Sequence, residues 1–455
     1  MDASDFPGGP SAQGSDLGLT HLLRTADAQG LAECQSGNVD ITSLLPAARP
    51  ATTPARPLRV LLTTDWWEPV VNGVVASVQT LRRELMALGC EVRVLTLSQG
   101  WRTRREPGVY RLGSVSAGLV YDRARIGMPG SRRVLRDIER WHPDVIHSQC
   151  EFSTFVWARR LARTLAVPLV HTYHTIYEDY THYYSPSRTM GRKVVASFSR
   201  RVLAGTDAII APTAKVSRLL RGYEVDRPVS VIPTGLDLHR FRPAADAAER
   251  ADAAALRARL GIAPGQKVLL SVSRLAKEKN LDEVIDMVAA ADRADAVLVL
   301  VGDGPYRHEL DERVDALGLR ERVRFAGVVD PAEVQRWYRL GDVFVSASLS
   351  ETQGLTFIEA MACGLPLLCR RDPSLAEVVL EDRTGWQYET PEQFRAHLAQ
   401  LLEDPHRREE MSLAAAEHAR ATCGAETFGS RVLDVYREAI GRRTPRIIAP
   451  QAVVA

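Results

Sequence analysis

The sequence predicts an α/β protein built from two doubly wound parallel sheets. From residue 58 onward, short apolar runs alternate with helix-period stretches, which is the pattern of βαβ units. This alternation stops at Pro233-Thr234-Gly235 and restarts at residue 268. The chain has 455 residues, which is more than one core usually absorbs, because domains run to roughly 100–200 residues. Together these observations predict two domains.

Residues 1–57 precede this pattern and are rich in Gly, Ser, Ala and Pro. They show no sustained period, and their last part contains Pro46, Pro50, Pro54 and Pro57. This composition is typical of a disordered tail. We therefore expect the first domain to occupy residues 58–235.

In the first domain, a strand is expected at residues 59–63, followed by a loop that contains Asn72-Gly73. The next helix should cover residues 74–88 and end at Gly89, because glycine commonly terminates helices. Further strands are expected at residues 92–97, 144–147, 169–172, 208–211 and 230–232.

Residues 236–266 are interpreted as the hinge region, and the second domain is expected over residues 236–426. Its strands are predicted at residues 268–273, 297–301, 323–325, 343–346 and 367–369. A last helix over about residues 427–440 lies beyond the final strand, within a C-terminal segment at 427–455. We expect this helix to cross back onto the first domain.

Charge is distributed unevenly, although the formal net charge is only +2. Residues 57–240 hold 27 basic and 16 acidic side chains, whereas residues 241–455 hold 28 and 34. A positive first domain indicates a surface that faces anions, unless the imbalance is ordinary solvated charge. No dense Lys/Arg run has the patterning of a nucleic-acid reader, so no nucleic-acid partner is expected.

Two further properties concern the compartment. The six cysteines are scattered without a C-x-x-C pair, which fits a reducing environment. No apolar run approaches the roughly 18–20 residues that span a bilayer, and Asp2 and Asp5 stand where a signal peptide would be basic. We expect a soluble or peripheral protein.

Residues that directly follow predicted strands are candidates for function, because open parallel sheets bind ligands beyond the carboxyl ends of their strands. Arg274 and Lys279 follow the strand at 268–273. An Arg that grips two oxygens and a Lys that acts as a point charge suit a diphosphate whose charge rises as it leaves. The alternative is an ordinary solvated loop.

The strongest signal is the segment S-E-T-Q-G-L-T-F-I-E-A-M-A at residues 350–362. Seven residues separate Glu351 from Glu359, which places the first in a loop and the second in the following helix. Carboxylates accept paired hydroxyls, so the two suit a sugar and a ribose on either side of a diphosphate. The helix is expected to open toward a phosphate through the amides of Gly354, Leu355 and Thr356.

The turn at Asn72-Gly73 opens a helix in a similar way and would present N–H groups to an anion. We predict Gly73 as a donor-binding residue, although a glycine that only permits a tight turn would give the same pattern. The turn lacks the G-x-G-x-x-G fingerprint, which argues against a nicotinamide dinucleotide.

With these motifs, residues 58–440 resemble the retaining glycosyltransferase family with the GT-B fold, which includes glycogen synthases and bacterial lipid glycosyltransferases. The runs A-M-A-C-G-L-P and V-G-D-G-P add to the two carboxylates and the Arg274/Lys279 pair. The resemblance implies two Rossmann-like domains that face each other across a cleft. It also implies that Glu351 contacts the donor sugar and that Glu359 holds the ribose hydroxyls. Arg274 and Lys279 would hold the diphosphate.

The resemblance also assigns a histidine. The T-x-H element of the family falls on Thr172, Tyr173 and His174, which implies that His174 lies near the donor sugar and the attacking hydroxyl. His171 is interpreted as a core histidine, and the same alternative applies to His174.

The aromatic and ionisable run after His174, together with Gln353, is similar to bacterial diacylglycerol glucosyltransferases. Those enzymes attach glucose to the free hydroxyl of a membrane lipid. A packing or hinge role is the alternative for this run. Thr234 stands where many relatives carry Asn, which puts a local hinge contact in doubt. The acceptor-side candidates are Tyr177, Glu178, Asp179 and His182.

An enzyme with a lipid acceptor must reach a bilayer. Residues 187–203 hold five basic and no acidic side chains interleaved with apolar ones, and residues 101–140 hold ten arginines against four acids. A basic amphipathic surface lies in the interface and prefers anionic lipid. We expect a cytoplasmic protein bound peripherally to the inner face of the cell membrane.

The resemblance implies a front-face substitution that retains configuration. The chain contains no D-x-D triplet, the usual carboxylate pairing for a metal on a nucleotide diphosphate, so no metal and no cofactor is expected besides the UDP-sugar co-substrate. The expected function is transfer of a hexose, glucose, from a UDP-sugar to diacylglycerol. The alternatives are a soluble acceptor, such as an inositol phosphate or a glycan, and a non-transferring sugar-nucleotide binder or epimerase.

Overall fold

The computed structural model describes residues 56–117, 125–128, 132–178, 188–348 and 350–443. From Pro57 onward the chain forms one compact unit. The tail predicted over residues 1–57 lies outside the described residues, apart from its last two positions.

The first domain contains, within the described residues, an eight-stranded sheet in the order β10-β9-β8-β7-β1-β2-β4-β3. Its neighbouring strands run parallel except for the antiparallel pair β3 and β4. The strands are β1 (Arg59–Thr63), β2 (Glu91–Leu97), β3 (Arg104–Glu106), β4 (Val109–Leu112), β7 (Val145–Ser148), β8 (Leu169–Thr172), β9 (Ala208–Ala211) and β10 (Val229–Val231). A separate antiparallel pair consists of β5 (Ser114–Ser116) and β6 (Arg125–Gly127).

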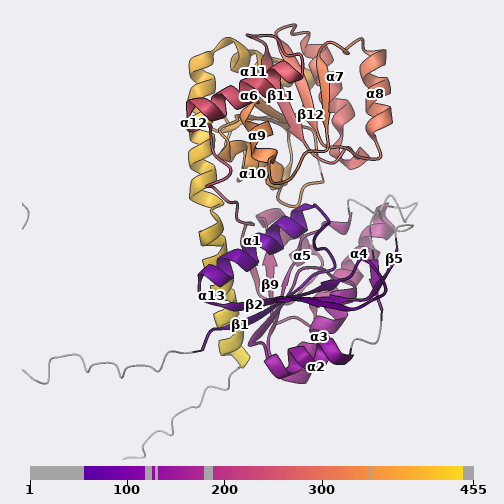
Figure 1. Cartoon of the computed structure of the whole chain (residues 1–455). Helices are drawn as coiled ribbons and strands as arrows, with labels where there is room; N and C mark the ends of the chain where they lie inside the picture. The colour runs from indigo at the N-terminus through magenta and orange to yellow at the C-terminus, as the bar shows by residue number, and fades with distance from the viewer. Residues whose placement is uncertain (1–55, 118–124, 129–131, 179–187, 349, 444–455) are drawn as a thin grey trace, which may run out of the picture. The chain divides into compact units, whose positions relative to one another are not determined.

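Helices cover both faces of this sheet, as parallel sheets require. The helices of the first domain are α1 (Gly73–Ala87), α2 (Arg132–Trp141), α3 (Ser153–Leu165), α4 (Arg188–Leu203) and α5 (Ala214–Gly222). In β1, Val60 and Leu62 join the core on the α1 side, whereas Leu61 joins the core formed with α2 and α3 on the other face (Figure 1). Because β1 is buried on both faces, its three central residues are all apolar, which is why the sequence revealed it.

The second domain contains, within the described residues, a six-stranded parallel sheet in the order β13-β12-β11-β14-β15-β16. The strands are β11 (Lys267–Val272), β12 (Ala296–Val301), β13 (Val323–Gly327), β14 (Val343–Ser346), β15 (Leu367–Arg370) and β16 (Gly385–Tyr388). The helices and short 3₁₀ turns are α6 (Ala247–Arg259), η3 (Lys277–Lys279), α7 (Leu281–Ala291), α8 (Arg307–Ala316), α9 (Val334–Arg339), α10 (Leu355–Ala362), η4 (Pro373–Leu375), α11 (Pro391–Glu403) and α12 (Pro405–Thr422).

The C-terminal helix α13 (Ala425–Arg443) crosses back onto the first domain, as predicted. Its Phe428, Val432 and Tyr436 share a hydrophobic core with β1 and α1. The chain passes from the first domain to the second near residue 236 and returns near residue 423. These two segments lie side by side, because the Leu236 N–H donates to the Cys423 carbonyl at 2.7 Å. Only a glycine fits at residue 235, where a Cβ would come within 2.6 Å of the Ala425 Cα.

Some elements differ from the prediction. The strands β3 to β6 and β16 were not predicted, and α6 lies inside the predicted hinge region at 236–266. This helix is packed rather than part of a hinge, since Leu256 is buried in a core of the second domain. Its start is capped by the Asp246 side chain, which accepts from the Glu249 N–H.

Candidate active site

The segment from residue 350 to 359 links β14 to α10. Gly354 has φ +74°, and α10 begins directly after it at Leu355. The left-handed turn requires glycine, because a Cβ would meet the Phe357 ring at 2.8 Å. Glu351 therefore lies in the loop and Glu359 in the helix, and the amides of Leu355 and Thr356 are at the helix N-terminus, where an anion is favoured.

The structure brings Glu351 together with Lys279. Lys279 closes the short helix η3 after β11, and its Nζ lies 2.6 Å from the Glu351 Oε1. Burial alone would raise the pKa of Glu351, but the charge and hydrogen bond of Lys279, the hydrogen bond of Ser348 and the charge of Lys215 together outweigh it, so the pKa lies below the ordinary value. Glu351 is therefore ionised and accepts hydrogen bonds.

Arg274, which also follows β11, contacts a different partner. Its Nη2 lies 2.6 Å from the Glu278 Oε1. The Ser350 hydroxyl in turn donates to the Glu278 carbonyl at 3.3 Å, which ties the Arg274 loop to the Glu351 loop. Both cations thus lie on the loop that follows β11, and this loop adjoins the Glu351 loop that follows β14.

Glu359 occupies a more apolar environment than Glu351. Its Oε2 accepts from the Tyr338 hydroxyl at 2.7 Å. Burial raises the pKa of Glu359 to about 7, although Tyr338 and Arg240 favour the ionised form. This carboxyl therefore titrates near neutral pH.

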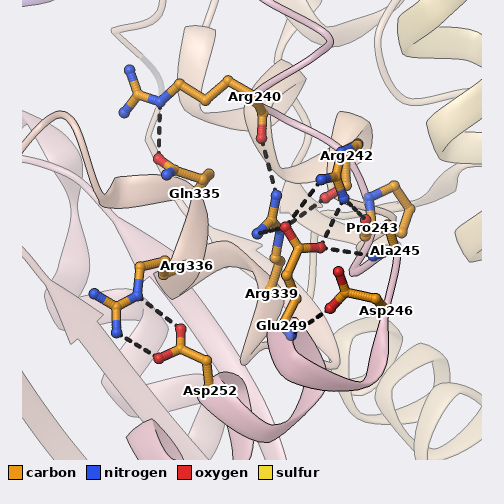
Figure 2. A network of polar contacts seen from close by, with 10 residues as sticks. All are labelled: Arg240, Arg242, Pro243, Ala245, Asp246, Glu249, Asp252, Gln335, Arg336 and Arg339. Carbon is orange, nitrogen blue, oxygen red and sulfur yellow. Dashed lines mark hydrogen bonds and ion pairs between the residues drawn. The ribbon is translucent and has the colours of Figure 1, made fainter.

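Arg240 belongs to a polar network that attaches the segment after residue 236 to α9. Figure 2 shows its Nε directed at Gln335, at 2.9 Å, and its carbonyl accepting from Arg339 at 3.2 Å. Glu249 bridges the Arg242 and Arg339 guanidinium groups in the same network. The guanidinium beside Glu359 is held by the hydrogen bond to Gln335, and its buried Nη2 has no hydrogen-bond partner among the described residues.

Gly73 starts α1 after Asn72, whose side chain accepts from the Val75 N–H at 2.9 Å. A Cβ on Gly73 would lie 3.5 Å from the Leu355 Cδ1, so the first residues of α1 and α10 are in contact distance of each other. Two helix N-termini thus converge at this point. Their combined partial positive charge suits an anionic ligand.

Gln353 and Thr234, which the sequence singled out separately, bind each other. The Thr234 N–H donates to the Gln353 Oε1 at 2.8 Å, and the Gln353 Nε2 donates to the Thr234 carbonyl at 3.2 Å. The Thr234 hydroxyl also lies 3.1 Å from that of Ser77 on α1. Thr234, which replaces the Asn of many relatives, therefore makes specific hydrogen bonds to both domains through Gln353 and Ser77.

Lys215 was missed by the sequence reasoning. Its Nζ donates to both Asp372 carboxylate oxygens, at 3.0 and 3.2 Å, and to the Glu351 carbonyl at 3.3 Å. The neighbouring Thr213 hydroxyl donates to the Thr352 carbonyl at 2.9 Å. Both residues follow β9, so the carboxyl-end rule that identified Arg274 would also have identified them.

His174 lies just beyond β8 and is partly exposed. Its Nε2 is 2.8 Å from the Gln149 Oε1. Burial, and secondarily the neighbouring His171, lowers the pKa of His174 to about 3. The imidazole is therefore neutral at physiological pH and provides a hydrogen-bonding group rather than a charge.

His171 is a core histidine, as interpreted from the sequence, but it has an acidic partner. It is fully buried, and its Nε2 lies 3.2 Å from the Glu151 Oε1. The Tyr177 hydroxyl donates to the other Glu151 oxygen at 2.5 Å. Burial and the Glu151 charge raise the pKa of Tyr177 well above its ordinary value, so its hydroxyl stays protonated.

The acceptor-side candidates are only partly brought together. Tyr177 contacts Glu151, whereas Glu178 accepts from the Tyr223 hydroxyl at 2.8 Å and pairs with Arg192 at 3.0 Å. Asp179 and His182 lie outside the described residues.

Three further residues at the carboxyl ends of strands were not predicted. Asp65 follows β1, and Gln149 and Glu151 follow β7. The Asp65 carboxylate accepts from the Ser153 and Thr154 N–H groups, at 2.9 and 2.7 Å, and so caps α3. Their signal was their position directly after β1 and β7. It was hard to see because the residues are divided between two loops that are far apart in the sequence.

The basic segment predicted at 187–203 forms α4. Its Met190, Val194 and Phe198 are exposed and recur every four residues, so they share one helix face. Exposed basic side chains flank that face, among them Arg192, Lys193, Arg200 and Arg201. None of the helices in the described ranges is long and apolar enough to cross a bilayer.

In the part of the chain that the structure describes, no group of three or more His, Cys, Asp or Glu side chains is arranged to hold a metal ion. The cationic groups near the candidate donor site are instead Arg274, Lys279 and Lys215.

Two family models match the chain. Residues 71–240 match Glycosyltransferase Family 4, and residues 252–418 match Glycosyl transferases group 1. The chain is 36% identical over 389 residues to an alpha-monoglucosyldiacylglycerol synthase of Streptococcus pneumoniae, covering 84% of this chain and 86% of that protein. It is 30% identical over 406 residues to D-inositol 3-phosphate glycosyltransferase 2 of Catenulispora acidiphila, covering 81% and 90%.

Solved structures show the same fold. Sucrose-phosphate synthase from Thermosynechococcus elongatus gives a TM-score of 0.67 at 21% identity, over 85% of this chain and 100% of that chain. The Anabaena protein HepE in complex with UDP-glucose gives 0.66 at 18% identity, over 84% and 100%. With this two-domain architecture and these sequence matches, the chain belongs to the group 1 glycosyltransferases of the GT-B fold.

Proposed function

We propose that the protein transfers glucose from UDP-glucose to the free hydroxyl of diacylglycerol with retention of configuration, giving an α-glucolipid. The observation that carries this proposal is the 36% identity to the alpha-monoglucosyldiacylglycerol synthase over 84% of the chain. That similarity is higher than the 30% identity to the inositol phosphate enzyme.

On the donor side, Glu351 binds sugar hydroxyls and Lys279 binds the diphosphate. Their 2.6 Å ion pair supports this assignment, because one bound molecule that carries both groups would replace it with contacts to each partner. Arg274 and the converging N-termini of α1 and α10 add positive charge for the departing diphosphate. Glu359 accepts from the ribose hydroxyls in its ionised form.

In the transfer step, the bond between the sugar C1 and the diphosphate oxygen breaks, and the acceptor oxygen bonds to C1 on the same face. The acceptor proton passes to the leaving phosphate oxygen. His174 hydrogen-bonds to the reacting groups without taking that proton, because a pKa of about 3 makes it a weak base. Lys279, Arg274 and the helix N-termini stabilise the leaving diphosphate, so the reaction needs no metal.

The exposed apolar face of α4 inserts into an anionic membrane surface, and its flanking Arg and Lys residues bind the lipid headgroups. This places the enzyme peripherally on the inner face of the cell membrane. Flotation with vesicles at low salt tests this: binding should require anionic lipid, and equal binding to neutral vesicles would contradict it.

The deciding assay offers vesicles that contain diacylglycerol together with UDP-glucose, UDP-galactose or GDP-mannose. We expect a glucosyl product from UDP-glucose, identified by mass and by an α-anomeric signal, with full activity in EDTA. Activity that EDTA abolishes and Mg²⁺ restores would disprove the metal-independent step.

A soluble acceptor is the second candidate, and the likeness to D-inositol 3-phosphate glycosyltransferases favours it. An arm of the same assay without vesicles therefore offers inositol phosphate. Transfer to inositol phosphate, with none to diacylglycerol, would replace the lipid assignment.

A further inference from the structure

A pocket of about 480 Å³ lies between α3 and α4 in the first domain. This volume is within the range of small-molecule sites, roughly 300–1,000 Å³. Its walls are mainly apolar and include Phe155, Val156, Val194, Phe198 and Val202, with Glu151 also in the lining. We call it the α3–α4 pocket.

The apolar walls of the α3–α4 pocket remain open to solvent. Val156 on α3 is 59% exposed and Val194 on α4 is 63% exposed. Apolar side chains gathered around an open pocket keep surface in water that a bound apolar group would cover. An apolar ligand therefore fits this pocket better than a polar one.

Aromatic side chains connect the pocket to the candidate acceptor site. Phe198 stacks on Phe152 with ring centroids 6.2 Å apart, and Phe152 meets the edge of Tyr177 at 5.9 Å. Tyr177 donates to Glu151, which lines the pocket itself. Glu151 is two residues from Gln149, the partner of His174. The apolar surface is thus continuous with Tyr177, an acceptor-side candidate, and with Glu151, to which Tyr177 donates.

Two cations also line the pocket, Arg159 from α3 and Arg201 from α4, together with Ser197. Long basic side chains pack their stems along apolar surface and direct the charge to the lipid–water interface. Their presence beside the exposed face of α4 is consistent with a pocket that opens toward lipid headgroups.

We propose that the α3–α4 pocket binds an acyl chain of the acceptor lipid while its glycerol hydroxyl lies at the Glu151 and Tyr177 end. This inference rests on the proposed lipid acceptor. It makes the pocket a determinant of acyl-chain length, because the pocket can enclose only as much of a chain as its volume of about 480 Å³ allows.

The test substitutes Val156→Trp, which fills the pocket from an exposed helix position outside the α4 face. Wild type and variant are assayed with dihexanoylglycerol and dioleoylglycerol in detergent micelles of one composition. We expect kcat/KM to fall at least about tenfold for dioleoylglycerol and at most about twofold for dihexanoylglycerol. Leu413→Trp, on α12 and 60% exposed, is the matched control and should change neither value.

A labelling experiment reads the pocket without turnover. A diacylglycerol with a photoreactive diazirine in one acyl chain should label peptides from α3 and α4 of the wild-type protein and less of Val156→Trp. Equal losses for both acceptors, or labels confined to other helices, would overturn the inference. If the wild type labels α3 and α4 but glucosylates no diacylglycerol, the proposed function fails while the pocket assignment stands. Absence of both transfer and label rejects both.

Discussion

The two domains present their candidate residues in different ways. In the second domain, Glu351, Gly354 and Glu359 come from one continuous loop and helix, and Lys279, which follows the neighbouring strand β11, pairs with Glu351. In the first domain, Asp65, Gln149 and Glu151 with His171 and His174 are contributed by the ends of β1, β7 and β8.

This difference explains which residues a sequence can reveal. A site built on one loop–helix unit has fixed spacing along the chain, whereas a site assembled from several strand ends acquires its spacing only from the order of the strands. Substitutions in the second domain should therefore change donor binding and turnover, whereas substitutions in the first domain should change acceptor binding.

The largest effect is expected from Lys279→Ala on the donor side. We expect kcat to fall by about 10²–10³, because removing a preorganised charge from a developing oxyanion costs that much. Steady-state glucosylation measures it. Lys277→Ala, an exposed lysine of the same short helix, should stay within about twofold. Equal activities of the two variants would show that Lys279 does not stabilise the diphosphate.

Glu151→Gln tests the acceptor side. The amide cannot accept from both His171 and Tyr177 as the carboxylate does, and a lost buried hydrogen bond costs about 1–3 kcal/mol. We expect the acceptor KM to rise about 5- to 100-fold while the donor KM is unchanged. Glu224→Gln, an exposed carboxylate in the same domain, serves as control. A variant in which only the donor KM changes would contradict the assignment of Glu151 to the acceptor side.

The affinity for UDP-glucose should depend on pH through Glu359. Its pKa of about 7 means that acidification protonates the carboxyl that accepts from the ribose, so binding weakens as the pH falls. Titration calorimetry should give a Kd about tenfold higher at pH 6 than at pH 8, from the change in ionised fraction. Glu359→Gln should bind weakly at both pH values. A pH slope that persists in this variant would exclude Glu359 as its origin.

The smallest effect on activity is expected where Gln353 of the second domain binds Thr234 at the end of the first. Gln353→Ala leaves the buried Thr234 N–H and carbonyl without their partner, so the free energy of unfolding should drop by about 1–3 kcal/mol. Turnover should change less than about threefold. Urea unfolding of this variant against Gln400→Ala, an exposed position on α11, measures the difference. A large loss of kcat without loss of stability would give Gln353 a role in the reaction.

Much of the fold could be predicted from the sequence. The predicted bounds of β1, β8, β9 and β14 coincide with the structure, because these strands are buried on both faces and read as apolar runs. The strands β3, β5 and β6 were missed since each has three residues and exposed positions, which leaves too little periodicity.

The candidate site shows the same limit. Gln353 and Thr234 were each noted in the sequence, but 119 positions separate them, so nothing in the local pattern linked them. In the sequence, Lys215 and Glu151 resemble ordinary surface charges. Their partners, Asp372 and Tyr177 respectively, follow other strands and become neighbours only in the fold. Contacts of this kind depend on topology rather than on spacing.

The return of α13 has a consequence for synthesis of the protein. Tyr436 binds the buried His147 through its hydroxyl, at 2.6 Å, and Val432 and Leu433 complete the core beside β1. These residues follow the whole second domain in the chain, so the part of the core that α13 adds beside α1 forms only after the second domain has been synthesised. A premature stop before residue 425 would therefore yield a chain that contains every candidate donor residue but lacks a finished amino-terminal half.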